Sequence, residues 1–175
     1  MSQPETAKNE VKAYTEAEMK DLLNKLQNDK NNPFPLDYWD EENKNPYEWE
    51  VVFIPPKDSI YDGGFFKAKI KFPKNYPLSK PNFYFRTKIY HLNISESSGS
   101  VCCTLKNTNN IMDYLDAVFL MFTSEQNPKS PYQAEWAKIY ETNMSEFTKK
   151  AKEWVQEYAT IDNYEDKKPT DFPGK

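Results

Sequence analysis

The sequence predicts a single α+β domain, with an N-terminal helix, a four-stranded antiparallel meander, a long irregular loop and three C-terminal helices. Three observations support this prediction. Apolar residues recur at helical spacing near the N-terminus, alternate with polar residues in the middle of the chain, and return to helical spacing after residue 113. Strands in one block and helices in others are typical of α+β proteins. A length of 175 residues suits one domain.

The first helix is predicted from about residue 15 to residue 28. Thr15 and Glu18 have the spacing of a capping box, in which each side chain bonds the other residue's backbone N–H. Apolar residues follow on one helical face, at positions 19, 22, 23 and 26. Residues 1–13 are polar and aperiodic, so we expect a flexible arm before a domain that spans residues 14–160.

The strands of the meander are predicted at residues 34–38, 48–53, 66–72 and 83–85, where apolar residues alternate with polar ones. The turn signal Asp62-Gly63-Gly64 favours antiparallel pairing of the second and third strands. Each strand has one apolar face, so we expect the sheet to be covered on one side only. The lysines of the third strand, at positions 67, 69 and 71, are interpreted as its solvated face.

The three C-terminal helices follow an irregular segment that extends from about Arg86 to Met112. We expect them to begin near Asp113, at the cap-and-proline pair Ser130-Pro131, and at Asn143, where Glu146 completes a capping signal. Their apolar stripes are interpreted as core rather than as a cofactor site. Residues 161–175 are predicted to be a disordered tail.

Bulk properties exclude several classes of protein. A net charge of -4 and a pI near 5.2 argue against nucleic-acid binding, which requires a basic surface. The mean hydropathy of -0.92 and the lack of a long apolar run argue against membrane insertion. The two cysteines are adjacent, and the first residues do not resemble a secretory signal. We therefore expect free thiols in a reducing compartment, the cytoplasm, the nucleus or both.

The irregular segment contains the single histidine and both cysteines. A loop cysteine is either a nucleophile or a buried thiol, and the residue type alone leaves both readings open. Zinc is not expected, because one histidine and two neighbouring cysteines do not complete a tetrahedral site. A hydrolase would need His91 as its base, although it lies close to Cys102 in sequence. The amide of Asn93 offers another chemistry, stabilisation of an oxyanion at a Cys102 thioester.

Over about residues 15–160 the chain resembles the ubiquitin-conjugating enzyme family. The shared motifs are Trp49, Ile54-Pro55-Pro56, Tyr61-Asp62-Gly63-Gly64-Phe65-Phe66, Tyr76-Pro77-Leu78-Ser79-Lys80-Pro81, Lys88-Ile89-Tyr90-His91-Leu92-Asn93-Ile94, Gly99-Ser100-Val101-Cys102, Asn127-Pro128, Ser130-Pro131 and Glu153-Trp154-Val155-Gln156-Glu157-Tyr158-Ala159. No single motif is decisive, but their order agrees with the predicted order of elements.

The resemblance implies that Cys102 accepts ubiquitin, or a ubiquitin-like modifier, from an activating enzyme as a thioester. It then passes the modifier to a substrate lysine, usually with a ubiquitin ligase and without a cofactor. Asn93 matches an asparagine that stabilises the oxyanion or orders the loop, and His91 matches a structural histidine. Thr104 and Ser130 stand where many members carry aspartates near the incoming lysine, so lysine activation is expected to be weak or to come from a partner.

Two further departures from the family pattern concern the loop. Leu92 replaces the usual proline before Asn93, and the spacing from Asn93 to Cys102 is one residue longer than is usual. Cys103 is expected to be a packed neighbour rather than the nucleophile. Ser130 has a competing interpretation as the cap of the following helix. These departures keep open a second function, a catalytically weak or inactive member that acts as a ubiquitin-binding adaptor.

The resemblance also predicts surfaces for protein partners. Leu78 in the first loop, with Ile111 and Met112 in the second, are the expected contacts for a ligase. Lys20 and Lys25 on the first helix are the expected contacts for the activating enzyme. Neither nucleic acid nor membrane is an expected partner.

Overall fold

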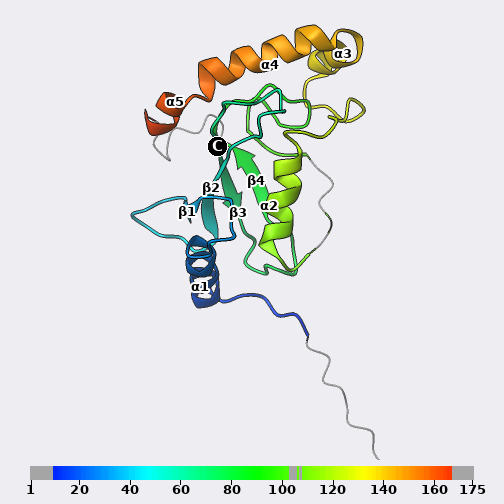
Figure 1. Cartoon of the computed structure of the whole chain (residues 1–175). Helices are drawn as coiled ribbons and strands as arrows, with labels where there is room; N and C mark the ends of the chain where they lie inside the picture. The colour runs from blue at the N-terminus through cyan, green and yellow to red at the C-terminus, as the bar shows by residue number, and fades with distance from the viewer. Residues whose placement is uncertain (1–9, 103–105, 107, 167–175) are drawn as a thin grey trace, which may run out of the picture.

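The order of elements agrees with the predicted order of a helix, a meander and C-terminal helices (Figure 1). The computed structural model describes residues 10–102, 106 and 108–166. The elements are α1 (Glu16–Gln27), β1 (Leu36–Tyr38), β2 (Glu48–Phe53), β3 (Phe66–Lys71), β4 (Asn82–Phe85), α2 (Ile111–Leu120), α3 (Ala134–Thr142), α4 (Met144–Tyr158) and α5 (Ile161–Asp166). Residues 1–9 of the expected arm and 167–175 of the expected tail lie outside the described residues. Among the described helices, none has the length and apolar character needed to cross a bilayer.

Helix α1 begins where its capping box predicts. The Thr15 N–H donates to the Glu18 carboxylate at 2.7 Å, and the Glu18 N–H donates to the Thr15 hydroxyl at 3.2 Å. Met19, Leu23 and Leu26 are buried on one face of the helix. The local signal for this helix therefore agrees with its packing.

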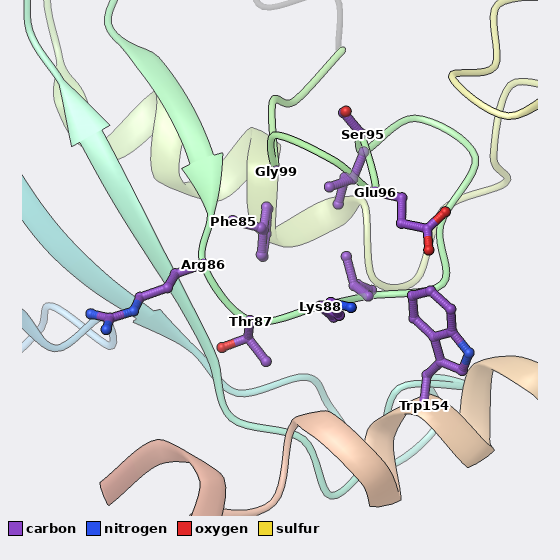
Figure 2. Close-up of a pocket in the computed structure, with 10 residues that line it drawn as sticks. Phe85, Arg86, Thr87, Lys88, Ser95, Glu96, Gly99 and Trp154 are labelled. Atoms are coloured by element: carbon purple, nitrogen blue, oxygen red, sulfur yellow. The ribbon is translucent and has the colours of Figure 1, made fainter. Parts of the chain in front are cut away.

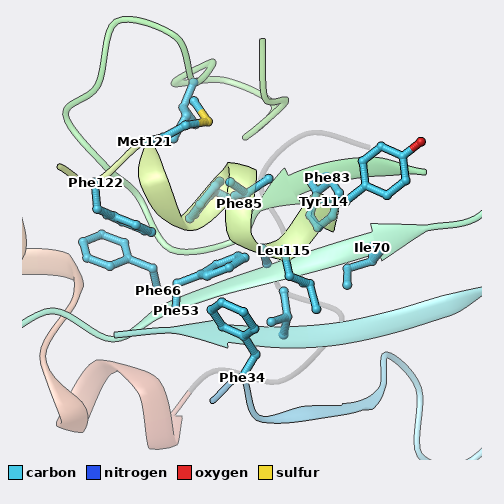
Figure 3. Packing of buried hydrophobic residues seen from close by; sticks show 14 of the residues in the cluster. Phe34, Phe53, Phe66, Ile70, Phe83, Phe85, Tyr114, Leu115, Met121 and Phe122 are labelled. Atoms are coloured by element: carbon cyan, nitrogen blue, oxygen red, sulfur yellow. The ribbon is translucent and has the colours of Figure 1, made fainter. Parts of the chain in front are cut away.

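The four strands form one antiparallel sheet in the order β1-β2-β3-β4, which confirms the meander. In the register of β2 and β3, Phe53 lies opposite Phe66 and Val51 opposite Ala68. These four side chains are buried in one core cluster, in which Phe53 and Phe66 lie on the side of the sheet that faces α2 (Figure 3). Phe122, just after α2, has its ring centroid 5.2–5.9 Å from the rings of Phe53, Tyr61, Phe66 and Phe85. The core around the end of α2 is therefore aromatic.

The outer face of the sheet is less solvated than the lysine alternation predicts, and for Lys67 that prediction is wrong. Lys67 is only 8% exposed, and its Nζ lies 3.5 Å from the Glu50 carboxylate on β2. Lys69 pairs with Glu48 at 3.2 Å, and its ammonium lies 5.1 Å from the ring centre of Trp39. Long lysine stems cover apolar surface while their charges reach partners on the next strand.

Two helix starts differ from the prediction, one because a local cap forms earlier in the chain and one because the expected cap does not form. Helix α2 begins at Ile111, two residues before Asp113, because the Asn110 side chain accepts the Met112 N–H at 3.0 Å. Helix α3 begins at Ala134 rather than at Ser130-Pro131, and its N-cap residue makes no side-chain cap. The expectation that Ser130 caps this helix is therefore wrong.

The last part of the chain differs from the prediction in two ways. Helix α4 begins as expected, because the Asn143 side chain accepts the Glu146 N–H at 3.1 Å, yet Met144 of its predicted apolar stripe is exposed. The predicted disordered tail is wrong for residues 161–166, which form α5. The Asn163 side chain accepts the Thr160 N–H at 3.2 Å and its hydroxyl at 2.7 Å, which closes the first turn of this helix.

Candidate active site

Cys102 is an exposed free thiol at the end of a tethered segment. The residues before it lie along β4, where the Phe85 N–H donates to the Gly99 carbonyl at 2.7 Å and the Val101 N–H donates to the Phe83 carbonyl at 3.2 Å. The Cys102 N–H itself donates to the Asn93 carbonyl at 2.8 Å. The structure therefore holds the cysteine backbone in place and leaves its sulfur accessible, as a nucleophile requires. Cys103 and Thr104 lie outside the described residues.

Asn93 joins this segment to the one that contains Asn127 and Ser130. Its side-chain oxygen accepts the Asn127 N–H at 2.8 Å, and its Nδ2 donates to the Asn127 carbonyl at 3.0 Å and to the Ser130 carbonyl at 3.3 Å. Both N–H bonds of the amide are engaged in this way. In this conformation the amide orders the loop, and the longer bond to Ser130 is the one that would have to break before it could bind an oxyanion.

His91 has both ring nitrogens in hydrogen bonds to backbone. The Asn93 N–H donates to Nδ1 at 3.0 Å, so Nδ1 carries the lone pair, and Nε2 donates to the Met121 carbonyl at 3.0 Å. These partners require the neutral imidazole protonated on Nε2. Burial lowers the pKa of His91 to about 4, which keeps the ring neutral near pH 7. No lone pair remains for a thiol, which excludes the hydrolase reading in which His91 activates Cys102.

We expect this buried histidine to make folding pH-dependent. The unfolded ring has its ordinary pKa of about 6.5 and binds protons more readily than the folded ring, so stability is complete above that pH and falls as the pH drops toward 4. By pH 4.5 the loss should be about 2–3 kcal/mol. Urea unfolding between pH 7.5 and 4.5 measures it. His91 is the single histidine of the chain, so His91→Gln is the control, and parallel wild-type and variant profiles would contradict the expectation.

A buried polar network that the sequence does not reveal connects Leu92 with Gln126. The Leu92 N–H donates to the Gln126 side-chain oxygen at 2.8 Å, and Gln126 Nε2 donates to the Tyr61 hydroxyl at 2.7 Å. That hydroxyl donates to the Tyr90 carbonyl at 2.6 Å. No local signal identifies Gln126, because its partners lie 34 and 65 residues away in the chain. Leu92 thus contributes an N–H that proline would lack.

The other predicted site residues differ in how accessible they are. Ser130 is exposed, and its carbonyl, rather than its hydroxyl, bonds Asn93. Leu78 is 55% exposed. The predicted contact of Ile111 with a ligase is wrong, because its side chain is 2% exposed and packs in the core at the start of α2. Met112, by contrast, is half-buried.

Lys20 and Lys25 are both exposed on α1, as contact with another protein would require.

The most enclosed cavity described near the loop is too small for a ligand. It lies between the end of β4, the turn at residues 95–99 and Trp154 of α4 (Figure 2). Its volume of about 10 Å³ is on the order of a single water molecule. Among the described residues, no group of histidine, cysteine and acidic side chains is placed to hold a metal ion. Cys102 is not among the residues that line this cavity.

Comparisons with known proteins agree with this geometry. A family model described as ubiquitin-conjugating enzyme matches residues 14–155. Ubiquitin conjugating enzyme E2 B of Dictyostelium discoideum is 34% identical over 119 residues, which cover 66% of this chain and 80% of that protein.

Solved structures show the same fold. The E2 domain of a Toxoplasma gondii ubiquitin conjugating enzyme is 26% identical, with a TM-score of 0.71, and the match covers 82% of this chain and 98% of that one. A Plasmodium yoelii protein assigned to the ubiquitin-conjugating enzymes is 28% identical, with a TM-score of 0.69 and coverage of 81% and 93%. These neighbours confirm the α+β fold with its antiparallel meander.

Proposed function

Because this chain belongs to the ubiquitin-conjugating enzyme family, we propose that it carries ubiquitin as a thioester on Cys102 and transfers it to a substrate lysine. One observation carries this proposal. Cys102 is an exposed free thiol whose backbone N–H bonds the Asn93 carbonyl, in the segment where the family resemblance expects the nucleophile.

Two acyl transfers make up the proposed reaction. The Cys102 thiolate attacks the carbonyl carbon of the activating enzyme's thioester, a new C–S bond forms, and the activating enzyme's thiolate leaves. A neutral lysine amine of the substrate then attacks the Cys102 thioester, which forms an isopeptide bond and releases the Cys102 thiolate. The amine's proton passes to solvent or to a neighbouring base. Neither step changes an oxidation state, and neither needs a cofactor.

Lysine activation is the demanding step. A lysine ammonium has an ordinary pKa of about 10.4 and must lose a proton before it attacks. Ser130 is exposed beside Asn93 and has no negative charge to assist, and Thr104 is a second uncharged candidate near the incoming lysine. We therefore propose that a ligase or the substrate itself supplies part of this activation.

The proposal also includes contacts for two protein partners. Leu78 and Met112 are the proposed apolar contacts for a ubiquitin ligase, and Lys20 and Lys25 on α1 are the proposed contacts for the activating enzyme. Leu78 is the stronger ligase candidate, because its side chain is 55% exposed and is free to contact an apolar surface of a partner.

The test is formation of the thioester. Incubation with ATP, an activating enzyme and ubiquitin should give an adduct on a non-reducing gel that thiol reagents remove. Cys102→Ala should abolish the adduct, and Cys102→Ser should convert it to an ester that resists thiols. Cys103→Ser is the matched control and should load as the wild-type protein does.

Parallel reactions with ubiquitin-like modifiers and their own activating enzymes identify the modifier. An adduct with one of these and none with ubiquitin would reassign the modifier and keep the chemistry. No adduct with any modifier would contradict the proposal. It would favour the ubiquitin-binding adaptor, a reading that Leu92 and the uncharged Ser130 keep open.

A further inference from the structure

Gln126 occupies a central position among the segments that hold Cys102. It is 7% exposed, and both the oxygen and the nitrogen of its side-chain amide form hydrogen bonds within the protein. Its backbone N–H makes a third link, because it donates to the Tyr140 hydroxyl on α3 at 3.1 Å. Buried amides with this many partners fix the relative positions of the segments they join.

Two of those segments meet at Asn93. Gln126 holds Leu92, the residue immediately before Asn93, and it directly precedes Asn127, whose N–H and carbonyl both bond the Asn93 side chain. Asn93 is therefore held through its preceding residue on one side and through its own amide on the other. The Asn93 carbonyl then accepts the Cys102 N–H at 2.8 Å, so the clamp reaches the backbone of the cysteine.

The donor and the acceptor of each hydrogen bond in this network can be assigned. The Leu92 N–H can only donate, so the Gln126 oxygen accepts it and the Gln126 NH2 faces the Tyr61 hydroxyl. That hydroxyl must then donate its proton to the Tyr90 carbonyl. Burial raises the pKa of Tyr61 well above its ordinary value, which preserves this proton. A single arrangement of donors and acceptors satisfies all members.

From these contacts we infer that Gln126 is a positioning residue for transfer from the Cys102 thioester, acting through Leu92 and Asn93. This inference rests on the proposed function. It also explains the departure from the family at Leu92. Leucine, unlike the usual proline, has a backbone N–H, and this N–H is the donor to the Gln126 side-chain oxygen. Gln126 touches neither the thiol nor the lysine, and its effect is on where Asn93 and Cys102 are held.

The test uses thioester loaded on the full chain and then separated from ATP and activating enzyme. Its decay is followed with and without free lysine, and the ratio of aminolysis to hydrolysis is recorded. Gln126→Met keeps length and volume but removes the amide. We expect its lysine discharge to fall about tenfold, because displacement of groups near a reacting centre costs up to about a hundredfold and the bonds of Asn93 itself remain. Loading should stay within about twofold of wild type.

Leu92→Pro provides the decisive comparison. It removes the N–H that Gln126 accepts, so Gln126→Met should cost about tenfold in the wild-type background and less than about twofold in the Leu92→Pro background. A merely destabilising substitution would lower the amount of loaded protein without producing this coupling. Tyr61→Phe, which retains the ring, is a second route to the same network and should lower discharge about threefold.

Gln27→Met is the matched control. The Gln27 side-chain amide likewise donates a hydrogen bond within the protein, to the Leu36 carbonyl at 3.0 Å, but this residue lies at the end of α1. Its discharge rate should equal that of wild type. Equal discharge by wild type and Gln126→Met, or equal costs of Gln126→Met in both backgrounds, overturns the inference while the proposed function stands. A wild-type protein that forms no Cys102 adduct overturns both.

Discussion

Asn93→Ala is expected to lower lysine discharge from the Cys102 thioester by about a hundredfold while loading falls much less. The physical reason is the loss of three side-chain bonds, two to Asn127 and one to Ser130, which fix the loop beside the cysteine. Either role of the asparagine, ordering the loop or binding the oxyanion, requires this amide. Single-turnover discharge to free lysine, measured on preloaded protein, checks the result.

The chain offers a close structural match as control for this variant. Asn32 also accepts a backbone N–H on its side-chain oxygen, from Phe34 at 2.9 Å, and donates to a carbonyl, that of Leu26 at 3.1 Å. It lies between α1 and β1. Asn32→Ala should lower the free energy of unfolding by about 1–2 kcal/mol, as Asn93→Ala should, but leave discharge unchanged. A similar loss of discharge in both variants would show that general destabilisation, not the Asn93 contacts, is responsible.

Phe122→Ala is expected to produce the largest loss of stability, about 3–5 kcal/mol in the free energy of unfolding. The ring is buried, and it contacts the rings of Phe53, Phe66 and Phe85 from three strands as well as that of Tyr61. Its removal leaves a cavity where the sheet meets the end of α2 (Figure 3). Urea unfolding followed by circular dichroism measures the effect.

Leu120→Ala is the control two residues away. Leu120 is 59% exposed, so truncating it should change the free energy of unfolding by less than about 0.5 kcal/mol. If Phe122→Ala cost as little, the aromatic cluster would not be the tightly packed core that the structure shows. Removal of the Phe122 ring should also weaken the nearby hydrogen bond between His91 and the Met121 carbonyl. The Phe122→Ala variant should therefore form little Cys102 thioester at 37 °C.

The features that the sequence predicts correctly are those set by neighbouring residues. The capping box of Thr15 and Glu18 and the cap at Asn143 lie within four residues of the N–H groups they bond, so the starts of α1 and α4 can be read directly. Alternation along the strands likewise predicts the meander. A motif resemblance, rather than composition or spacing, singles out Cys102, whose role stays a prediction.

The errors at Ser130, Lys67 and Gln126 arise where residues distant in sequence decide the structure. The segment after Asn127 stays irregular through Gln133, where the Asn93 amide holds the Ser130 carbonyl and the Tyr132 N–H donates to the Leu92 carbonyl at 2.9 Å. A local cap-and-proline signal does not include those bonds. Lys67 is buried for a similar reason, because its partner Glu50 lies on the adjacent strand. The sequence does not predict the burial of Gln126, because an isolated glutamine belongs to no local pattern that indicates a buried position.

The segment that precedes Cys102 also affects how the protein behaves among other copies of itself. An outer strand with unpaired backbone groups is a template for association with other chains, and β4 would be such a strand on the side opposite β3. Instead, residues Gly99 and Val101 bond the backbone of Phe85 and Phe83 there. Substitutions that detach this segment should therefore expose a strand edge that can pair with other chains, and they should also displace the thiol. Natural selection for solubility and selection for activity should therefore act on the same positions.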